Sequence, residues 1–213
     1  MRRLGFLKYV VIGTLLLAFG FLAGASVRNW AQAKNVPTSK PQTEAVQSVE
    51  SNSSSATITA LFSPEDNIQK TLVNTINNAQ RNILVQAYLF TDERIGDALI
   101  AAHKRGVNVE ILLDSEMALA GKNVLIMRLF EVGIPIRLET LYENAHNKIM
   151  IFDHDTAKAV VVTGSYNFTY SAQKRNAENV VVIRNAPAIV ACYVDNWRKH
   201  AEQAIPYAGN PIS

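Results

Sequence analysis

From residue 57 onward, short apolar runs alternate with amphipathic stretches, and this alternation restricts the fold more than any other feature of the chain. Two stretches have apolar residues at helical spacing, so each predicts a helix with one buried face: Ile68, Leu72, Ile76 and Ala79, and then Ile95, Leu99 and Ala102. A third helix is predicted at 123–131, ended by Gly133. The runs between them predict strands: TITALF (57–62), NILVQAYLF (82–90), VNVEILL (107–113) and IPIRLET (134–140).

Two polar clusters predict where the first helices begin. Ser63 would be an N-cap, followed by a proline in the first turn and an acid at Asp66, which is close to a capping box. Thr91 would cap the second helix, with Asp92 and Glu93 in its first turn, where the helix dipole favours negative charge.

The second half predicts antiparallel strands and a final helix. KIMIFD (148–153) and AVVVTG (159–164) are joined by a short polar turn, which is typical of a hairpin, and ENVVVI (178–183) is a further strand. The final helix, 187–204, carries Ile189, Cys192, Tyr193 and Trp197 on one face. The whole pattern predicts an α/β fold, an α-β-α sandwich around a mixed β-sheet.

The N-terminal region has the pattern of an export signal. Residues 1–8 hold three positive charges, whereas residues 9–27 are apolar and hold none. Small residues before Ser26 offer a cleavage site, yet the apolar run also has about the 20 residues that a membrane span requires. A cleaved signal peptide and a retained membrane tether through residues 9–27 therefore both stay open. The positive start predicts that the folded part lies across the membrane from the cytoplasm.

Composition divides the chain further. Residues 1–33 are the signal peptide or signal anchor. Residues 34–56 are rich in Ser, Thr, Asn and Gln without apolar periodicity, so they predict a flexible linker. Residues 57–205 form the folded domain, and residues 206–213 are a C-terminal tail.

The charge distribution excludes a broadly basic binding surface. The formal net charge is +3, but residues 1–56 carry six Lys+Arg against two Asp+Glu, and residues 57–213 carry fifteen against sixteen. Anion recognition by the domain must therefore be local.

Cys192 is the single cysteine, so neither an intrachain disulfide nor a Cys-based zinc site can form. Asp114 and Glu116 would make a metal pair only with a third ligand that the sequence does not indicate, so we expect neither a metal nor another cofactor.

Residues that can carry chemistry gather in three motifs at strand ends: H-N-K (146–148), G-S-Y-N (164–167) and R-N-A-E-N (175–179). A strand projects residues i and i+2 to the same side, so His146 and Lys148 present an imidazole beside an ammonium. An apolar strand needs neither group for its own stability, whereas a bound phosphate could use both.

Together the motifs supply what phosphodiester cleavage needs. The imidazole of His146 could attack phosphorus as a nucleophile. Lys148, Ser165 and Asn167 could bind the non-bridging oxygens as negative charge spreads onto them. Glu178 could hold the far ring nitrogen of a histidine and so orient it.

A single set of these residues cannot complete the reaction, because it contains only one histidine. In-line displacement places the nucleophile and the leaving group on opposite sides of phosphorus, so a single His146 cannot both attack and protonate the departing oxygen. A second copy related by a two-fold axis would supply the missing acid. The prediction is an obligate homodimer with one composite active site.

His146, Lys148 and Asp153 form H-x-K-x₄-D, which is followed by G-S-x-N, and this set is the signature of the phospholipase D superfamily. Over residues 57–205 the chain resembles the bacterial endonuclease branch with a single motif. The resemblance implies a dimer of α-β-α sandwiches, a phosphohistidine intermediate and hydrolysis without a metal. It also implies matching roles for the site residues: His146, Lys148, Ser165, Asn167 and Glu178.

The same resemblance favours nucleic acid as the substrate, DNA more than RNA and with little sequence preference. It also implies export across a bacterial inner membrane. The domain would then lie in the periplasm, or be anchored at the membrane if the leader is retained. Asp153 is an odd number of residues from His146, so it should face the other way. We interpret it as structural support for the hairpin turn.

Plainer interpretations of single residues stay open. His146 and Lys148 could be a solvated strand start, Ser165 and Asn167 ordinary turn residues, and Glu178 a surface residue. Lys174 and Arg175 are predicted to bind substrate phosphates, although a solvated basic turn would look the same. Two further groups of residues, the aromatic residues near the site and the remaining histidines, also have plain interpretations. The aromatic residues of the third quarter could stack on bases or pack in the core: Tyr166, Phe168 and Tyr170. The remaining histidines are expected at the surface: His103, His154 and His200.

Two other functions also stay open. One is hydrolysis of phospholipid head groups by a phospholipase D-type enzyme. The other is a non-catalytic dimer that binds nucleic acid or anionic lipid in the same groove.

Overall fold

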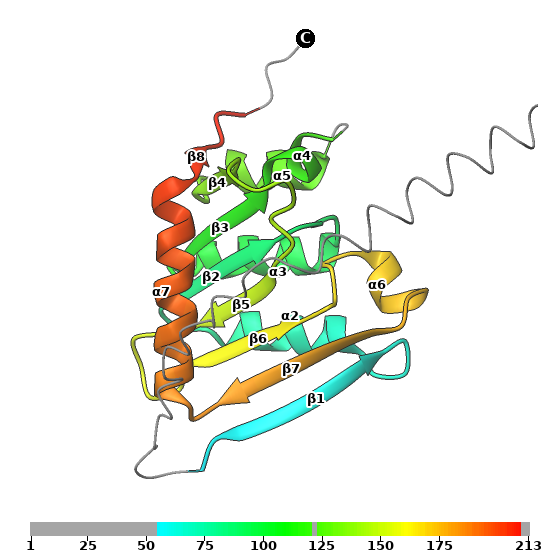
Figure 1. Ribbon diagram of the computed structural model, residues 1–213, viewed down its shortest axis with the longest axis vertical. Helices are drawn as coiled ribbons and strands as arrows, with labels where there is room; N and C mark the ends of the chain where they lie inside the picture. Colours follow the sequence, from blue (N-terminus) through cyan, green and yellow to red (C-terminus); the bar gives the residue numbers. More distant parts are fainter. Residues whose placement is uncertain (1–54, 121–122, 210–213) are drawn as a thin grey trace, which may run out of the picture. The chain divides into compact units, whose positions relative to one another are not determined.

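The computed structural model describes residues 55–120 and 123–209, and within them eight strands form one sheet in the order β1-β7-β6-β5-β2-β3-β4-β8 (Figure 1). The predicted signal segment and nearly all of the predicted linker lie outside these residues. The elements follow one another along the chain as β1 (Thr57–Ser63), α2 (Ile68–Asn78), β2 (Asn82–Ala87), α3 (Glu93–Lys104), β3 (Asn108–Asp114), α4 (Ser115–Leu119), α5 (Val124–Glu131), β4 (Ile136–Glu139), β5 (Lys148–Phe152), β6 (Val160–Gly164), α6 (Tyr170–Lys174), β7 (Glu178–Arg184), α7 (Pro187–Gln203) and β8 (Ile205–Pro206).

The sheet is mixed. Strands β2, β3 and β4 are parallel and are connected through helices, whereas β5 joins β2 in the antiparallel sense. Strands β5, β6, β7 and β1 continue as antiparallel neighbours, and β5 and β6 form the expected hairpin. The prediction of an α/β fold around a mixed sheet is confirmed.

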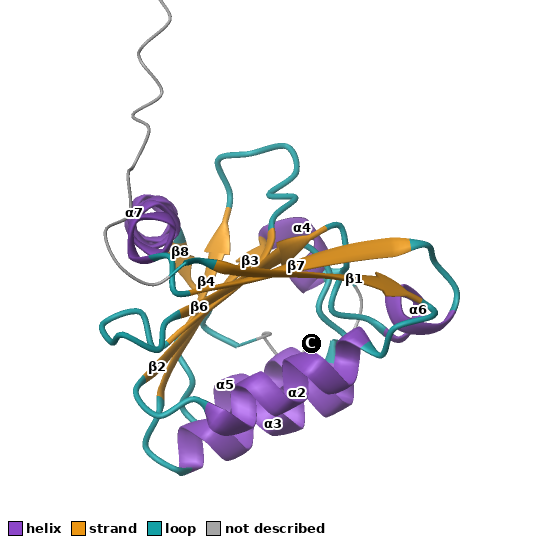
Figure 2. Cartoon of the chain, turned by 90° about the horizontal axis from the view of Figure 1, so that it is seen from below, coloured by secondary structure: helices purple, strands orange, loops and turns teal. Residues whose placement is uncertain are grey.

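Helices cover both faces of the sheet (Figure 2). On one face α2 and α3 bury the predicted apolar stripes, with Ile68, Ile95 and Leu99 fully inaccessible to solvent. On the other face α7 packs Val190, Val194 and Trp197 against residues of the central strands such as Leu112. Burying one such aliphatic or aromatic side chain contributes about 1.5–3 kcal/mol of stability. The two helical layers therefore stabilise the sheet on both of its faces.

Both predicted helix caps are wrong, the first by four residues and the second by one. Helix α2 is capped by Asn67, whose side chain accepts a hydrogen bond from the backbone N–H of Lys70, and not by Ser63. Ser63 still belongs to β1, and its hydroxyl is used in a tertiary hydrogen bond to the carbonyl of Ala172. Helix α3 is capped by Asp92 and not by Thr91. In each case the residue with an acceptor side chain closest to the first helical turn takes the cap.

The predicted inner face of the final helix is confirmed at Trp197 and Tyr193 and is wrong at Ile189 and Cys192. Ile189 and Cys192 are exposed, and the buried stripe is Val190, Val194 and Trp197. The chain also remains folded beyond residue 205, since Pro206 pairs with β4 and Tyr207 is buried against the core. The domain boundary that was expected at residue 205 therefore falls inside strand β8. No helix in the described part of the chain has the length and apolar character that a membrane crossing requires.

Candidate active site

Three strand ends meet at one edge of the sheet. Strand β5 begins at Lys148, β6 ends at Gly164 and β7 begins at Glu178. The register pairs Ala87 at the end of β2 with Lys148, and Gly164 with Val180. Because antiparallel neighbours place the start of one strand beside the end of the next, motifs that are separate in the sequence come together here.

His146 and Lys148 stand at the mouth of β5. His146 is exposed in the loop before the strand, while Lys148 is its first residue and is only 6% exposed. The Lys148 Nζ donates a hydrogen bond to the His146 carbonyl oxygen at 2.6 Å. Burial lowers the pKa of Lys148, and the negative charge of Glu178 acts in the opposite direction. A poorly hydrated ammonium at this position attracts a phosphate oxygen more strongly than a solvated one would.

Tyr88 is a site residue that the sequence did not reveal. It follows β2, and its ring centroid lies 4.4 Å from that of the His146 imidazole. The Lys148 Nζ lies 4.9 Å from the same Tyr88 centroid, and the Tyr88 hydroxyl donates to the Asn144 side chain at 3.3 Å. Tyr88 therefore contacts both residues of the H-x-K motif. Sequence patterns assigned it to a strand over 82–90, and only the pairing of β2 with β5 brings it to the site.

The G-S-Y-N motif continues from the end of β6. The Ser165 hydroxyl donates to Glu178 Oε2 at 2.6 Å and accepts from the Asn179 backbone N–H at 3.0 Å. The side-chain oxygen of Asn167 is buried and has no hydrogen-bond partner within the described residues. A buried polar atom without a partner raises the free energy of the folded state. The Asn167 side-chain oxygen is thus an acceptor that a ligand with an N–H or O–H donor could satisfy.

Glu178 has partners other than the one expected. In the ranges 55–120 and 123–209 no hydrogen bond joins it to the His146 ring; it accepts from Ser165 and, at 2.9 Å, from the Asn176 side chain. The pairing of β7 with β6 places Glu178 beside Ser165, and its carboxylate is engaged there instead of at the His146 ring. Its charge nevertheless reaches Lys148, whose pKa it raises against the effect of burial.

Replacing Glu178 with glutamine should move the alkaline limb of the pH–rate profile to lower pH. In the phosphodiester cleavage that the sequence predicts, Lys148 would bind a phosphate oxygen only in its protonated form. Burial lowers its pKa from the ordinary 10.5, and Glu178 opposes that effect. Without the carboxylate the pKa of Lys148 falls further, so the charged form is lost earlier as pH rises. Hydrolysis rates between about pH 7 and 11 would measure the shift. The exposed Glu116→Gln is the control, and an unmoved limb in Glu178→Gln would contradict the coupling.

Asp153 lies at the opposite end of β5 from His146. Its carboxylate accepts hydrogen bonds from the three consecutive backbone N–H groups of residues 80–82, at 2.8–3.3 Å. Its own backbone has φ 48°, in the left-handed region. Asp153 therefore ties the hairpin turn to the loop between α2 and β2, and the structure does not bring it to the site.

The other candidates divide between surface and core. Lys174 ends α6 and Arg175 follows it, and both are exposed. Tyr166 and Phe168 are buried in the core, at 1% and 2% exposure, whereas Tyr170 is 60% exposed. The core interpretation therefore holds for the first two aromatics but not for the third.

The surface expectation for the remaining histidines is wrong for His200. Its Nδ1 lies 2.5 Å from a carboxylate oxygen of Glu139, which is buried and also accepts from the Gln86 amide. Asp114 serves the fold as well. It caps α4 by accepting from the Met117 N–H, and it accepts from the Ala145 N–H beside the site.

Gly164→Ala should destabilise the domain and reduce turnover together. A Cβ at this position would lie 2.2 Å from the Asn179 carbonyl oxygen, which is backbone in the neighbouring strand. The strands must separate to admit it, and this should lower the free energy of unfolding by about 1–3 kcal/mol and displace Ser165 from Glu178. Thermal melting and hydrolysis rates would measure both effects.

Gly96→Ala is the matched control for Gly164→Ala. The atom nearest to its added Cβ, at 2.3 Å, is the end of the Leu125 side chain, which can rotate, and the position lies in α3 away from the site. Gly96→Ala should leave turnover unchanged. A Gly164→Ala variant with wild-type stability and wild-type turnover would show that the close approach of the strands is not required.

A family model and two named relatives are similar to this chain. A family model described as "Cardiolipin synthase, PLD-like domain" matches residues 72–200. The chain is 38% identical over 156 residues to a protein named "Phospholipase D" from Rickettsia prowazekii (strain Madrid E), covering 72% of this chain and 73% of that protein. It is 30% identical over 136 residues to a mouse "Mitochondrial cardiolipin hydrolase", covering 63% of this chain and 58% of the relative.

Among solved structures, the chain is similar to a phospholipase D family member, Nuc from Salmonella typhimurium. The TM-score is 0.67 and the sequences are 32% identical, covering 72% of this chain and 99% of that one. Residues 72–200, which the family model matches, include the strand ends that form the site, from Ala87 to Glu178.

Proposed function

Because the chain belongs to the phospholipase D superfamily of phosphodiesterases, we propose that it hydrolyses the phosphodiester bonds of nucleic acid through a covalent intermediate on His146. The observation that carries this proposal is the convergence of the three motifs at one sheet edge, where the Lys148 ammonium is hydrogen-bonded to the backbone of His146. The exposed Lys174 and Arg175 next to this edge favour a polyanion as the substrate.

The reaction has two displacements. In the first, a ring nitrogen of His146 attacks phosphorus, a P–N bond forms, and the P–O bond to the leaving group breaks as that oxygen receives a proton. In the second, water attacks the phosphohistidine, loses a proton to the group that acted as acid, and the P–N bond breaks. Lys148 and the side-chain N–H groups of Asn167 stabilise the charge that builds on the non-bridging oxygens in both steps.

The acid comes from His146 of a second copy of the chain. In-line attack requires it to stand on the far side of phosphorus, and the three motifs of one chain contain a single histidine. The active unit is then a homodimer whose two-fold axis passes through the site.

Mixed dimers test this arrangement. Two differently tagged full-length chains, one wild type and one His146→Ala, are co-expressed, and the dimers carrying both tags are isolated. The composite site predicts a loss of about 10²-fold or more, because one half of the acid–nucleophile pair is missing. Independent sites in each chain would instead leave about half of the activity, and that result would overturn the composite site.

A substrate panel tests the nucleic-acid assignment. The full-length chain is incubated with single-stranded DNA, duplex DNA, RNA and cardiolipin vesicles, with excess chelator present, and His146→Ala is run in parallel. The expected result is cleavage of DNA in chelator that is absent in the variant. A strict requirement for a divalent metal, or turnover of cardiolipin alone, would overturn the proposal.

Hydrolysis of phospholipid is the second candidate function. It is favoured by the matching family model and by relatives that are named for phospholipase D or cardiolipin hydrolase activity. A membrane tether through residues 9–27 would also hold the domain beside lipid head groups. The same panel separates the two candidates, since a lipid enzyme would release head groups from vesicles and leave DNA intact.

Export completes the proposal. The basic start and apolar run of residues 1–27 support passage across the bacterial inner membrane, with the domain in the periplasm or anchored at the membrane. Mass spectrometry of the mature N-terminus distinguishes a cleaved leader from a retained one. Protection of the domain from protease added to spheroplasts would contradict export.

A further inference from the structure

The segment between Asn167 and Glu178, here called the α6 lobe (residues 168–177), is fixed beside the site. At its start the Phe168 carbonyl oxygen accepts from the backbone N–H groups of Thr91 and Asp92, each at 2.9 Å. At its end the Asn176 side chain donates to Glu178. The lobe therefore has a defined position relative to the catalytic groups.

Tyr170 is the accessible aromatic residue of this lobe. The inner side of α6 is formed by Ala172 and Gln173, which are buried, so Tyr170 is on the outer side with 60% of its surface exposed. The guanidinium carbon of Arg175 lies 5.7 Å from the Tyr170 ring centroid. This cation–π contact holds the ring in place and sets a positive charge next to it.

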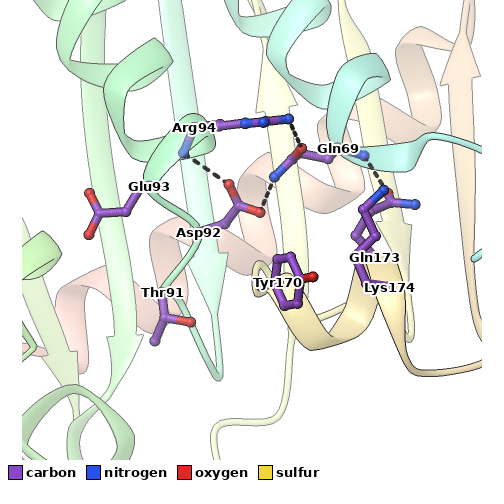
Figure 3. Close-up of a pocket in the computed structure, with 8 residues that line it drawn as sticks. All are labelled: Gln69, Thr91, Asp92, Glu93, Arg94, Tyr170, Gln173 and Lys174. Atoms are coloured by element: carbon purple, nitrogen blue, oxygen red, sulfur yellow. Dashed lines mark hydrogen bonds between the residues drawn. The ribbon is translucent and has the colours of Figure 1, made fainter.

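A cavity of about 250 Å³ opens between Tyr170 and the starts of α2 and α3 (Figure 3). Polar side chains that line this cavity are hydrogen-bonded to one another. The Gln69 side-chain amide donates to Asp92, and the Gln69 backbone N–H donates to the Gln173 side chain. The second acid at its rim, Glu93, is paired with Arg128. Lys174 at the rim has no carboxylate partner within the residues that the structure describes.

We propose that the Tyr170 ring is a stacking platform for an unpaired base of a single-stranded nucleic acid, with the adjoining cavity receiving that base and with Lys174 and Arg175 binding the phosphates beside it. This inference rests on the proposed nucleic-acid function and specifies its substrate as single-stranded. An exposed ring flanked by cations is the arrangement that binds single strands without sequence preference, because every base has a face that can stack. A base paired in a duplex is not available to it.

The test compares two single-stranded oligonucleotides of equal length, one with normal bases and one that is abasic throughout. Tyr170→Leu in the full-length chain keeps an apolar side chain but removes the aromatic face. It should lower kcat/KM on the normal oligonucleotide by about 10- to 100-fold and leave kcat/KM on the abasic oligonucleotide unchanged. Tyr170→Trp, which retains an aromatic face, should restore cleavage of the normal oligonucleotide.

The cations have a separate readout. Arg175→Gln and Lys174→Gln should each reduce the slope of log kcat/KM against log salt concentration by about 0.7, the value for one phosphate contact on a single strand. Lys158→Gln, an exposed lysine in the turn at the opposite end of the β5–β6 hairpin, is the control and should leave that slope unchanged.

The possible failures are distinguishable. If the wild-type chain cleaves duplex DNA but neither oligonucleotide, the stacking platform is overturned and the proposed function stands. If it cleaves no nucleic acid of the substrate panel, both are wrong. If the wild-type chain cleaves both oligonucleotides, and Tyr170→Leu either matches it on the normal oligonucleotide or loses equally on both, the stacking platform alone is overturned. Because Tyr170 is exposed, its variants should melt at the wild-type temperature, which excludes misfolding as the cause of a loss.

Discussion

Replacing His146 with alanine should reduce phosphodiester hydrolysis by about 10⁴- to 10⁶-fold, the range observed when a catalytic nucleophile is removed. The variant loses both the nucleophile and, in a composite site, the acid supplied to the other copy. His146 is exposed in the loop before β5, so its removal leaves the core packing unchanged. Single-turnover rates on labelled DNA would measure the loss, and thermal melting would show that the fold persists.

Two observations complete the His146 experiment. Denaturation during turnover should leave labelled phosphate covalently attached to the wild-type chain, through a bond that acid breaks, and none attached to His146→Ala. His154→Ala removes a histidine from the turn at the far end of the same hairpin and should stay within about twofold of wild type. Retention of most activity in His146→Ala would exclude the covalent mechanism.

Lys148→Met should lower kcat by about 10²- to 10³-fold, with a smaller change in KM, because the ammonium stabilises charge that develops in the transition state. Methionine preserves an unbranched chain of similar length. Since burial already disfavours the charged form of Lys148 and lowers its pKa, removing the charge should not lower the melting temperature. A merely structural lysine would show the opposite pattern, with reduced stability and preserved turnover.

Lys158→Met is the matched control for Lys148→Met. Lys158 is exposed in the turn before β6, at the end of the hairpin away from the site. It should leave kcat and KM unchanged. Equal effects of the two substitutions would show that total charge, and not the position of Lys148, governs the reaction.

The sequence predicted much of the site because its motifs are local. The two-residue spacing of His146 and Lys148 predicted that both lie at the start of one strand; β5 begins at Lys148, and His146 lies in the loop just before it. The predicted hairpin also brought the G-S-Y-N motif back to the same sheet edge, because antiparallel neighbours return to their starting point. These inferences needed only the period of a strand and one turn.

Other features depended on contacts between distant segments. Tyr88 reaches His146 through the pairing of β2 with β5, and Glu178 meets Ser165 through the pairing of β7 with β6. In α7 two adjacent apolar stripes were available, and packing against the sheet selected the one containing Val190 and Val194. No local pattern distinguishes such choices.

The sequence by itself therefore determined the α/β class, the three motifs of the candidate site and the strand ends that carry them, because hydrophobic period and spacing act within one element. The tertiary structure decided which aromatic is buried and which is exposed: Phe168 enters the core while Tyr170, two residues later, faces solvent beside Arg175. The physical reason is that burial depends on which surfaces meet after the sheet has formed, and residues so close in the chain carry no separate local signal for it.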